Sequence, residues 1–182
     1  MYLLNRTKTY LCIALLMCGL ITFSSCKKKA EDNDIIIDKV IEKPQNEAKS
    51  CKKIDNNGKF PWIGNTYSYA IKVTPDNSLP KVENHEQTYI DNNIDLTIKR
   101  SDGSEFFSGR FTKNSFTGLL TREMRESGVL LNMKYEKSDA DNAYFLVSVG
   151  SPDEMIDDFT VVELIITRMG ATKLAAYNPS KQ

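Results

Sequence analysis

Cys26 has the clearest chemistry in this sequence, because it directly follows the small pair Ser24-Ser25 and an apolar run that ends at Phe23. The run Phe23-Ser24-Ser25-Cys26 is typical of a lipobox, in which the cysteine sulfur receives a diacylglyceryl group and the chain is cut before that cysteine. The mature protein would then begin at Cys26. Each buried CH₂ of an acyl chain contributes about 0.8 kcal/mol, so two or three chains predict a permanent membrane anchor.

The residues before Cys26 have the three parts of a secretory signal. Arg6 and Lys8 supply the positive start, and the apolar stretch 11–23 follows. A membrane-spanning helix needs about 20 apolar residues, so this stretch is too short for one. We therefore predict a removable lipoprotein signal over residues 1–25. The alternative is an ordinary cleaved signal in which Cys26 is unmodified.

Charged residues of both signs follow Cys26. Lys27-Lys28-Lys29 would sit at the phosphate level of a bilayer, and the acidic run Glu31-Asp32-Asn33-Asp34 comes next. This arrangement resembles the export signal of Bacteroidota surface lipoproteins, although Ala30 separates the lysines from the acids. We predict a protein of the cell envelope, anchored to the outer membrane through acylated Cys26. The domain could lie on the cell surface or face the periplasm, and the sequence leaves both locations as alternatives.

Nucleophilic and metal chemistry have little support elsewhere. His85 is the only histidine, and no Gly-x-Ser-x-Gly elbow accompanies it. Asp139 with Asp141, and the Asp-rich run 153–158, offer hard oxygen ligands for calcium, but Asp is also common in turns because it bonds its own backbone. We predict no catalytic residue, no metal and no cofactor. A glycan hydrolase acting through two carboxylates of these loops is the alternative.

Aromatic side chains are the remaining candidates for a binding site. Trp62, Tyr67 and Tyr69 could stack on a sugar or on a partner protein. Alternating tyrosines on a strand are more often half-buried packing residues with a solvated hydroxyl, so a core role is the competing interpretation.

Charge and cysteine content exclude further classes. Loss of Arg6 and Lys8 with the signal leaves 22 basic against 24 acidic side chains, a net charge of −2. Nucleic-acid binding needs a basic face, so we predict no nucleic-acid partner. With Cys26 acylated, Cys51 is the only free thiol of the mature chain, and no disulfide can form within it.

The mature chain divides into a tether and one domain. Residues 26–59 are polar, and we interpret them as a lipidated N-terminus and flexible tether. Apolar content rises at Phe60, so we place a β-rich domain at residues 60–182. Period-2 alternation over 67–74 and 94–99 predicts strands.

Three hairpins and one helix are expected within this domain. The hairpins join 94–99 to 106–112 through Asp102-Gly103, 129–137 to 143–150, and 159–169 to 172–177 across Gly170. Apolar residues at helical spacing predict one short helix within 113–128, capped by Ser115 and ended by Gly128 in the left-handed region. The fold predicted is mainly β, an antiparallel meander that forms a sandwich or a partly closed barrel.

Several segments also resemble a known family. They are Tyr89-Ile90-Asp91-Asn92-Asn93-Ile94, Arg100-Ser101-Asp102-Gly103-Ser104 with Phe106-Phe107-Ser108, Phe111-Thr112-Lys113-Asn114-Ser115-Phe116, and Arg168-Met169-Gly170. They are similar to those of domain of unknown function 4738, a family of Bacteroidota lipoproteins. The resemblance implies an envelope location and a shared fold, and no chemistry. We therefore expect an envelope lipoprotein whose domain is a non-catalytic binding or structural module, with a protein or glycan of the envelope as its partner.

Overall fold

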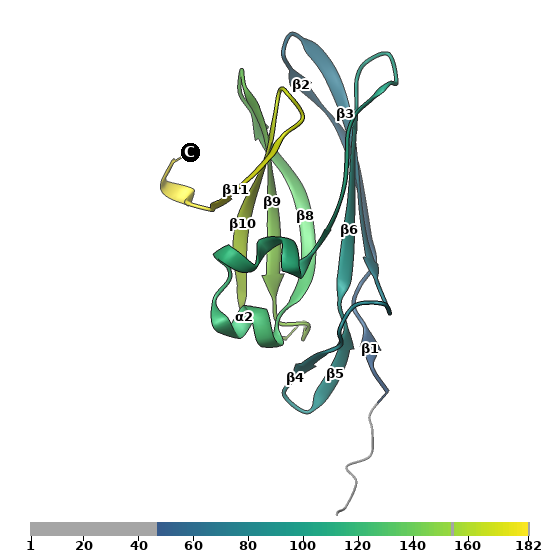
Figure 1. Cartoon of the computed structure of the whole chain (residues 1–182), viewed down its shortest axis with the longest axis vertical. Coiled ribbons are helices and arrows are strands. Elements are labelled where there is room, and N and C mark those ends of the chain that lie inside the picture. The colour runs from purple at the N-terminus through teal and green to yellow at the C-terminus, as the bar shows by residue number, and fades with distance from the viewer. Residues whose placement is uncertain (1–46, 154, 182) are drawn as a thin grey trace, which may run out of the picture. The chain divides into compact units, whose positions relative to one another are not determined.

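The computed structural model describes residues 47–153 and 155–181, so Cys26 and the predicted signal lie outside the part described. The described residues belong to one compact unit, Lys43–Gln182. Two four-stranded antiparallel sheets face each other in this unit, with a small three-stranded sheet and short helical segments beside them (Figure 1). The predicted mainly-β fold is confirmed in its sandwich form.

The first large sheet has the strand order β2-β3-β6-β7. Its strands are β2 (Ile54–Trp62), β3 (Asn65–Pro75), β6 (Asn92–Lys99) and β7 (Glu105–Thr112). Side chains alternate between the core and solvent, as the period-2 pattern predicts. The predicted hairpin between β6 and β7 is confirmed, with Gly103 at φ 83° in its turn.

The second large sheet is a meander with the order β11-β10-β9-β8. It contains β8 (Val129–Ser138), β9 (Asn142–Gly150), β10 (Phe159–Thr167) and β11 (Thr172–Ala176). Both predicted hairpins of this region are confirmed by the pairing of β8 with β9 and of β10 with β11. A short 3₁₀ helix, Pro179–Lys181, follows β11.

Ordered strands begin earlier than the predicted domain boundary at residue 60. β1 (Lys49–Ser50) pairs in parallel with β5 (Gln87–Ile90), and β4 (Val82–Asn84) completes the small sheet. The first half of β2 is polar, so its composition is that of a linker, yet its backbone pairs with β3. Ladder hydrogen bonds need no apolar side chains, which is why composition alone places the boundary too late.

The helical region contains one α-helix, as predicted, but it is shorter than expected. A 3₁₀ helix covers Lys113–Leu119, and the α-helix α2 covers Arg122–Ser127. Thr121 caps α2 by accepting from the Met124 N–H, whereas Ser115 accepts from the Thr112 N–H. The prediction for Gly128 was wrong: its φ is −81°. A side chain there would lie 2.7 Å from the Met124 carbonyl oxygen, so close packing explains this glycine.

One hydrophobic core fills the space between the two large sheets. Ile71, Leu96, Phe145 and Leu164 are fully buried in it. The helical segments contribute Phe116, Leu120 and Met124 to the same cluster, so their apolar side chains pack against the core between the sheets. Within residues 47–153 and 155–181, no helix combines the length and the apolar character that crossing a bilayer requires.

The turns of four hairpins lie at the end of the unit opposite the small sheet (Figure 1). Two of these turns are tied together, because the Arg168 N–H donates to the Asp141 carbonyl at 2.8 Å. The β2–β3 turn holds Ile63 at φ 52° and Gly64 at φ 72°. A β-branched residue in the left-handed region is strained, so Ile63 is an unusual choice for this turn.

Candidate functional site

Trp62 and Tyr67, two of the predicted stacking residues, are buried in the core, with 3% and 7% of their surface exposed. The Trp62 indole N–H donates to the Asp139 carbonyl at 2.9 Å, and its ring lies 5.2 Å from that of Tyr67. Tyr69 is half-buried and stacks on Tyr135 at 5.7 Å. The faces of these rings are covered by other rings, which favours the packing interpretation over ligand stacking.

The Asp-rich turn between β8 and β9 uses its carboxylates to hold itself together. Asp139 accepts from the backbone N–H groups of Asp141 and Asn142 and from the Tyr144 hydroxyl, the last at 2.6 Å. The Tyr144 hydrogen bond is the main reason that the pKa of Asp139 lies below its usual value. Asp153 similarly accepts from the Met155 N–H. Asp139 and Asp153 thus act as turn residues, the second interpretation of these loops.

His85 lies exposed at the β4–β5 turn with φ 53°. Across the two described ranges, no group of three His, Cys, Asp or Glu side chains is placed to hold a metal ion. Neither His85 nor the Asp-rich loops form such a group within these ranges.

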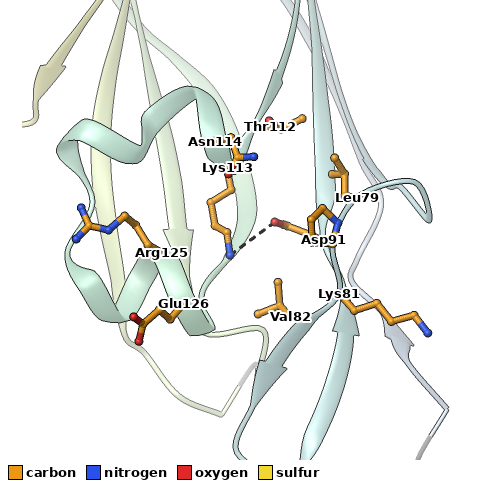
Figure 2. Close-up of a pocket in the computed structure, with 10 residues that line it drawn as sticks. Leu79, Lys81, Val82, Asp91, Thr112, Lys113, Asn114, Arg125 and Glu126 are labelled. Carbon is orange, nitrogen blue, oxygen red and sulfur yellow. Dashed lines mark ion pairs between the residues drawn. The ribbon is translucent and has the colours of Figure 1, made fainter.

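A pocket of about 200 Å³ lies where the first large sheet meets the helical segments (Figure 2). Asp91, directly before β6, and Lys113, at the start of the 3₁₀ helix, point toward each other across it. Apolar lining comes from Leu79, Pro80 and Val82, and the remaining lining residues are polar or charged: Lys81, Thr112, Asn114, Arg125 and Glu126. Four separate stretches of the chain, 79–82, 91, 112–114 and 125–126, thus enclose one mixed polar and apolar space.

Asp91 is only 4% exposed, and backbone groups fix its position. Its Oδ1 accepts from the Asn92 N–H and from the Leu130 N–H on β8, each at 2.8 Å. Burial raises the pKa of Asp91, because desolvation penalises the charged form more than these N–H groups and Lys113 favour it. The carboxylate therefore joins the two large sheets at a cost in charge solvation.

Lys113 is the opposite charge in the pocket. Its Nζ donates to the Gly128 carbonyl and lies 3.9 Å from Asp91 Oδ2, too far for a hydrogen bond. Burial lowers the pKa of Lys113, and the nearby Asp91 carboxylate offsets only part of this effect. For both partners desolvation outweighs the mutual attraction, as is common for buried ion pairs.

Arg125 is a further cation that lines this pocket. Its Nη1 donates to the Thr117 and Leu120 carbonyls at 3.4 and 3.3 Å. These bonds engage the guanidinium with the 3₁₀ helix, so Lys113 is the cation that faces Asp91.

Two further buried polar residues continue from Asp91 along the chain. Asn92 donates to the Leu130 carbonyl at 2.7 Å, and Asn93 donates to Asp76 Oδ2 at 2.9 Å. The Oδ1 atoms of both are buried without a hydrogen-bond partner among the residues described. Asp91-Asn92-Asn93 thus forms a buried polar row, and polar groups of this kind cost stability unless they are paired.

Cys51 lines a second pocket, of about 300 Å³, together with Asn92, Leu131 and Asp153. Burial, with a smaller contribution from the Asp91 charge, raises the pKa of its thiol to about 11. A thiol that stays protonated is a poor nucleophile, so the raised pKa argues against nucleophilic chemistry at Cys51.

Sequence reasoning did not identify Asp91 and Lys113 as site residues. Alternation drew attention to the apolar positions of β6, whereas the three polar residues before Ile94 are the informative signal. Three buried polar residues in a row, at and just before the start of a strand, must find hydrogen-bond partners in the protein. Both residues do lie in segments that carry the family resemblance.

The geometry defines a β-sandwich with a small polar pocket between one sheet and its helical cover. The chain belongs to the family of the domain of unknown function DUF4738, whose model matches residues 32–174. The predicted family membership is confirmed, and the match begins ahead of β1. The comparison with curated proteins finds no significant match.

Proposed function

We propose that this protein is a lipoprotein of the cell envelope, anchored to the outer membrane by acylated Cys26, whose β-sandwich is a non-catalytic binding module. The lipobox-like run before Cys26 supports the anchor. The observation that carries the binding role is the preorganised pocket. Two backbone N–H groups fix Asp91 and one carbonyl fixes Lys113, so the pocket exists before any ligand arrives.

The lining of this pocket favours binding over covalent catalysis. Its ten residues include neither cysteine, histidine nor serine, so Thr112 has no histidine beside it as a base. A second nucleophile type in the lining, Lys113, donates to the Gly128 carbonyl and faces the Asp91 carboxylate, which favours its charged form.

Acylation is tested on protein expressed with its full leader and recovered from membranes. Cells fed an alkyne analogue of palmitate should label the wild-type chain, and mass spectrometry should find the lipid on the N-terminal cysteine. Cys26→Ala should abolish labelling, and Cys51→Ala, the matched control, should retain it. An unmodified Cys26 thiol in the wild-type protein would remove the anchor from the proposal.

The membrane face is tested by protease treatment of intact cells. Cleavage of the domain without breaking the envelope assigns it to the surface. Full protection until the envelope is broken assigns it to the periplasm.

The alternative, a glycan hydrolase, draws support from a different pocket of about 430 Å³ on the second sheet. Glu136, Asp139 and Glu163 line it together with Tyr144. Glycoside hydrolysis needs one protonated carboxyl group and one carboxylate. The hydrogen bond from Tyr144 favours the ionised form of Asp139, which fits only the carboxylate role. Release of reducing ends from envelope glycans, lost in Asp139→Asn, would favour the hydrolase over the binding module.

A further inference from the structure

We infer that the Asp91–Lys113 pocket binds a neutral ligand through a hydroxyl group, as a sugar or another polyol presents it. This inference rests on the proposed binding role. Its starting point is the separation of 3.9 Å between Lys113 Nζ and Asp91 Oδ2. Two buried opposite charges usually approach to hydrogen-bond distance, because contact offsets part of their desolvation. Here other bonds hold each of them short of contact.

Each charged group has hydrogen-bonding capacity left on the side that faces the gap. In the part of the chain that the structure describes, the hydrogen bonds of Asp91 reach Oδ1, and none reaches Oδ2. Lys113 uses one of its three donors on the Gly128 carbonyl. The gap therefore offers one strong acceptor and one strong donor side by side.

The charges on the two sides select a neutral ligand. An anion would meet the Asp91 carboxylate, and a cation would meet the Lys113 ammonium. The best partner is a group that donates and accepts through one atom. A hydroxyl oxygen does so, and one placed about 2.8 Å from both charged atoms spans the gap. A trans peptide group directs its N–H and its carbonyl to opposite sides and cannot bridge them.

Pocket size and lining narrow the ligand further. At about 200 Å³ the pocket lies below the usual range for drug-sized ligands, about 300–1,000 Å³, so it suits a single sugar ring or a small polyol. Leu79 and Val82 form an apolar wall, which matches the C–H face of such a molecule.

Binding is measured by calorimetry and by saturation-transfer NMR on the full chain in detergent micelles. The probes are the methyl glycosides of glucose, galactose, mannose and N-acetylglucosamine, together with inositol. Cadaverine and inorganic phosphate serve as charged comparisons, and N-methylacetamide serves as the amide comparison. At least one neutral polyol should bind, and the charged and amide probes should not.

Three variants locate the site. Lys113→Met should weaken polyol binding about tenfold or more, because it removes the donor of the bridge. Leu79→Trp should abolish binding by filling the pocket while leaving both charges in place, which guards against a variant that simply unfolds. Lys81→Met, the matched control, removes a lysine that lines the same pocket but extends away from Lys113 (Figure 2), and it should change affinity less than twofold.

Three results would overturn the inference. The first is that no polyol binds, which would mean that solvent alone bridges the charges. The others are binding of phosphate or cadaverine that Leu79→Trp abolishes, and polyol binding that survives Leu79→Trp. The proposed anchor fails independently, since an unmodified Cys26 would leave sugar binding in the pocket unaffected.

Discussion

The sharpest quantitative test of this structure is a double-mutant cycle on Asp91 and Lys113. The single variants are Asp91→Asn and Lys113→Met, and the third variant carries both changes. Asparagine keeps an oxygen that can accept from the two backbone N–H groups, so the substitution removes charge with little change of shape. Methionine keeps most of the lysine side-chain volume without its charge. The cycle thus isolates the interaction between the two charges.

The expected coupling energy follows from the distance between the two charges and from their burial. At 3.9 Å and an effective dielectric constant of about 20, two unit charges attract by about 4 kcal/mol. The side chains of Lys113 and Asp91 are only 12% and 6% exposed, so solvent screens this attraction little. We expect Lys113→Met to lose about 3 kcal/mol of unfolding free energy, because it leaves the buried Asp91 charge unpaired. Asp91→Asn should lose less, because desolvation already disfavours the charged form of Asp91. The coupling energy should lie at about 2–4 kcal/mol.

The exposed pair Arg110–Asp95 provides the matched control. Its charged atoms are closer, at 2.7 Å, but the side chains are 63% and 39% exposed. Exposed pairs couple by about 0.2–1 kcal/mol. Distance alone would predict a larger coupling energy for this pair than for Asp91–Lys113. We expect the reverse order, because only Asp91–Lys113 is buried.

Urea unfolding measures both cycles, since urea carries no charge and leaves electrostatic interactions unscreened. Trp62 is the only tryptophan and is buried in the core, so its fluorescence reports global unfolding. Additive effects of Asp91→Asn and Lys113→Met, or a larger coupling for Arg110–Asp95, would refute the reasoning about this pocket.

Four further predictions follow from the described residues. Burial raises the pKa of Asp91 above its usual 3.8, so the stability of the wild type relative to Asp91→Asn should be highest below about pH 4. This difference in stability should fall as the pH rises through the folded-state pKa, and urea titrations at several pH values measure it. Ile63→Asn should stabilise the fold by about 1 kcal/mol, seen as a higher urea midpoint, because asparagine tolerates φ 52° better than isoleucine. Gly150→Ala should lower the unfolding free energy by about 2 kcal/mol or more in the same assay, because the added Cβ would lie 2.8 Å from the Phe159 Cα on the next strand. Gly118→Ala, with open space around the added Cβ, should change it by less than about 0.5 kcal/mol. At pH 8 the Cys51 thiol, with its pKa raised from 9.0 to about 11, should react with iodoacetamide about 100-fold more slowly in the folded chain than in urea, as peptide-resolved mass spectrometry can follow.

Each of these has an outcome that contradicts it. A wild-type advantage over Asp91→Asn that grows with pH would reverse the direction assigned to the Asp91 pKa. A lower urea midpoint for Ile63→Asn would mean that the isoleucine side chain contributes more than its backbone strain costs. Equal stabilities of Gly150→Ala and Gly118→Ala would contradict the packing at residue 150. Equal alkylation rates in folded and unfolded protein would place Cys51 in solvent.

Much of the sandwich could be predicted because its strands carry simple local signals. Alternation at 94–99 and turn residues such as Gly103 and Gly170 determine three hairpins, and all three are present. The helical region was harder to predict, since Thr121 interrupts a continuous apolar stripe and starts a new helix. The polar half of β2 could not be found from composition, because β3 supplies its hydrogen bonds.

The candidate site was less accessible to sequence reasoning than the fold. Asp91 and Lys113 are 22 residues apart, and neither has a spacing that indicates an ion pair. They meet only because β6 and β7 form a hairpin whose far ends return to the same place. Trp62 and Tyr67 illustrate the opposite case, in which residue type suggests binding but partners from other strands cover the rings.

The gathering of four hairpin turns at the end opposite β1 gives experimenters a place to add reporters. Gly103 and Gly170 sit in such turns with no atom within 4 Å of an added Cβ, so a short epitope inserted beside either should leave both sheets paired. An antibody against that epitope would detect the domain on unbroken cells only if the domain lies on the cell surface. The same two sites would accept fluorophores for following where the protein is and how it diffuses.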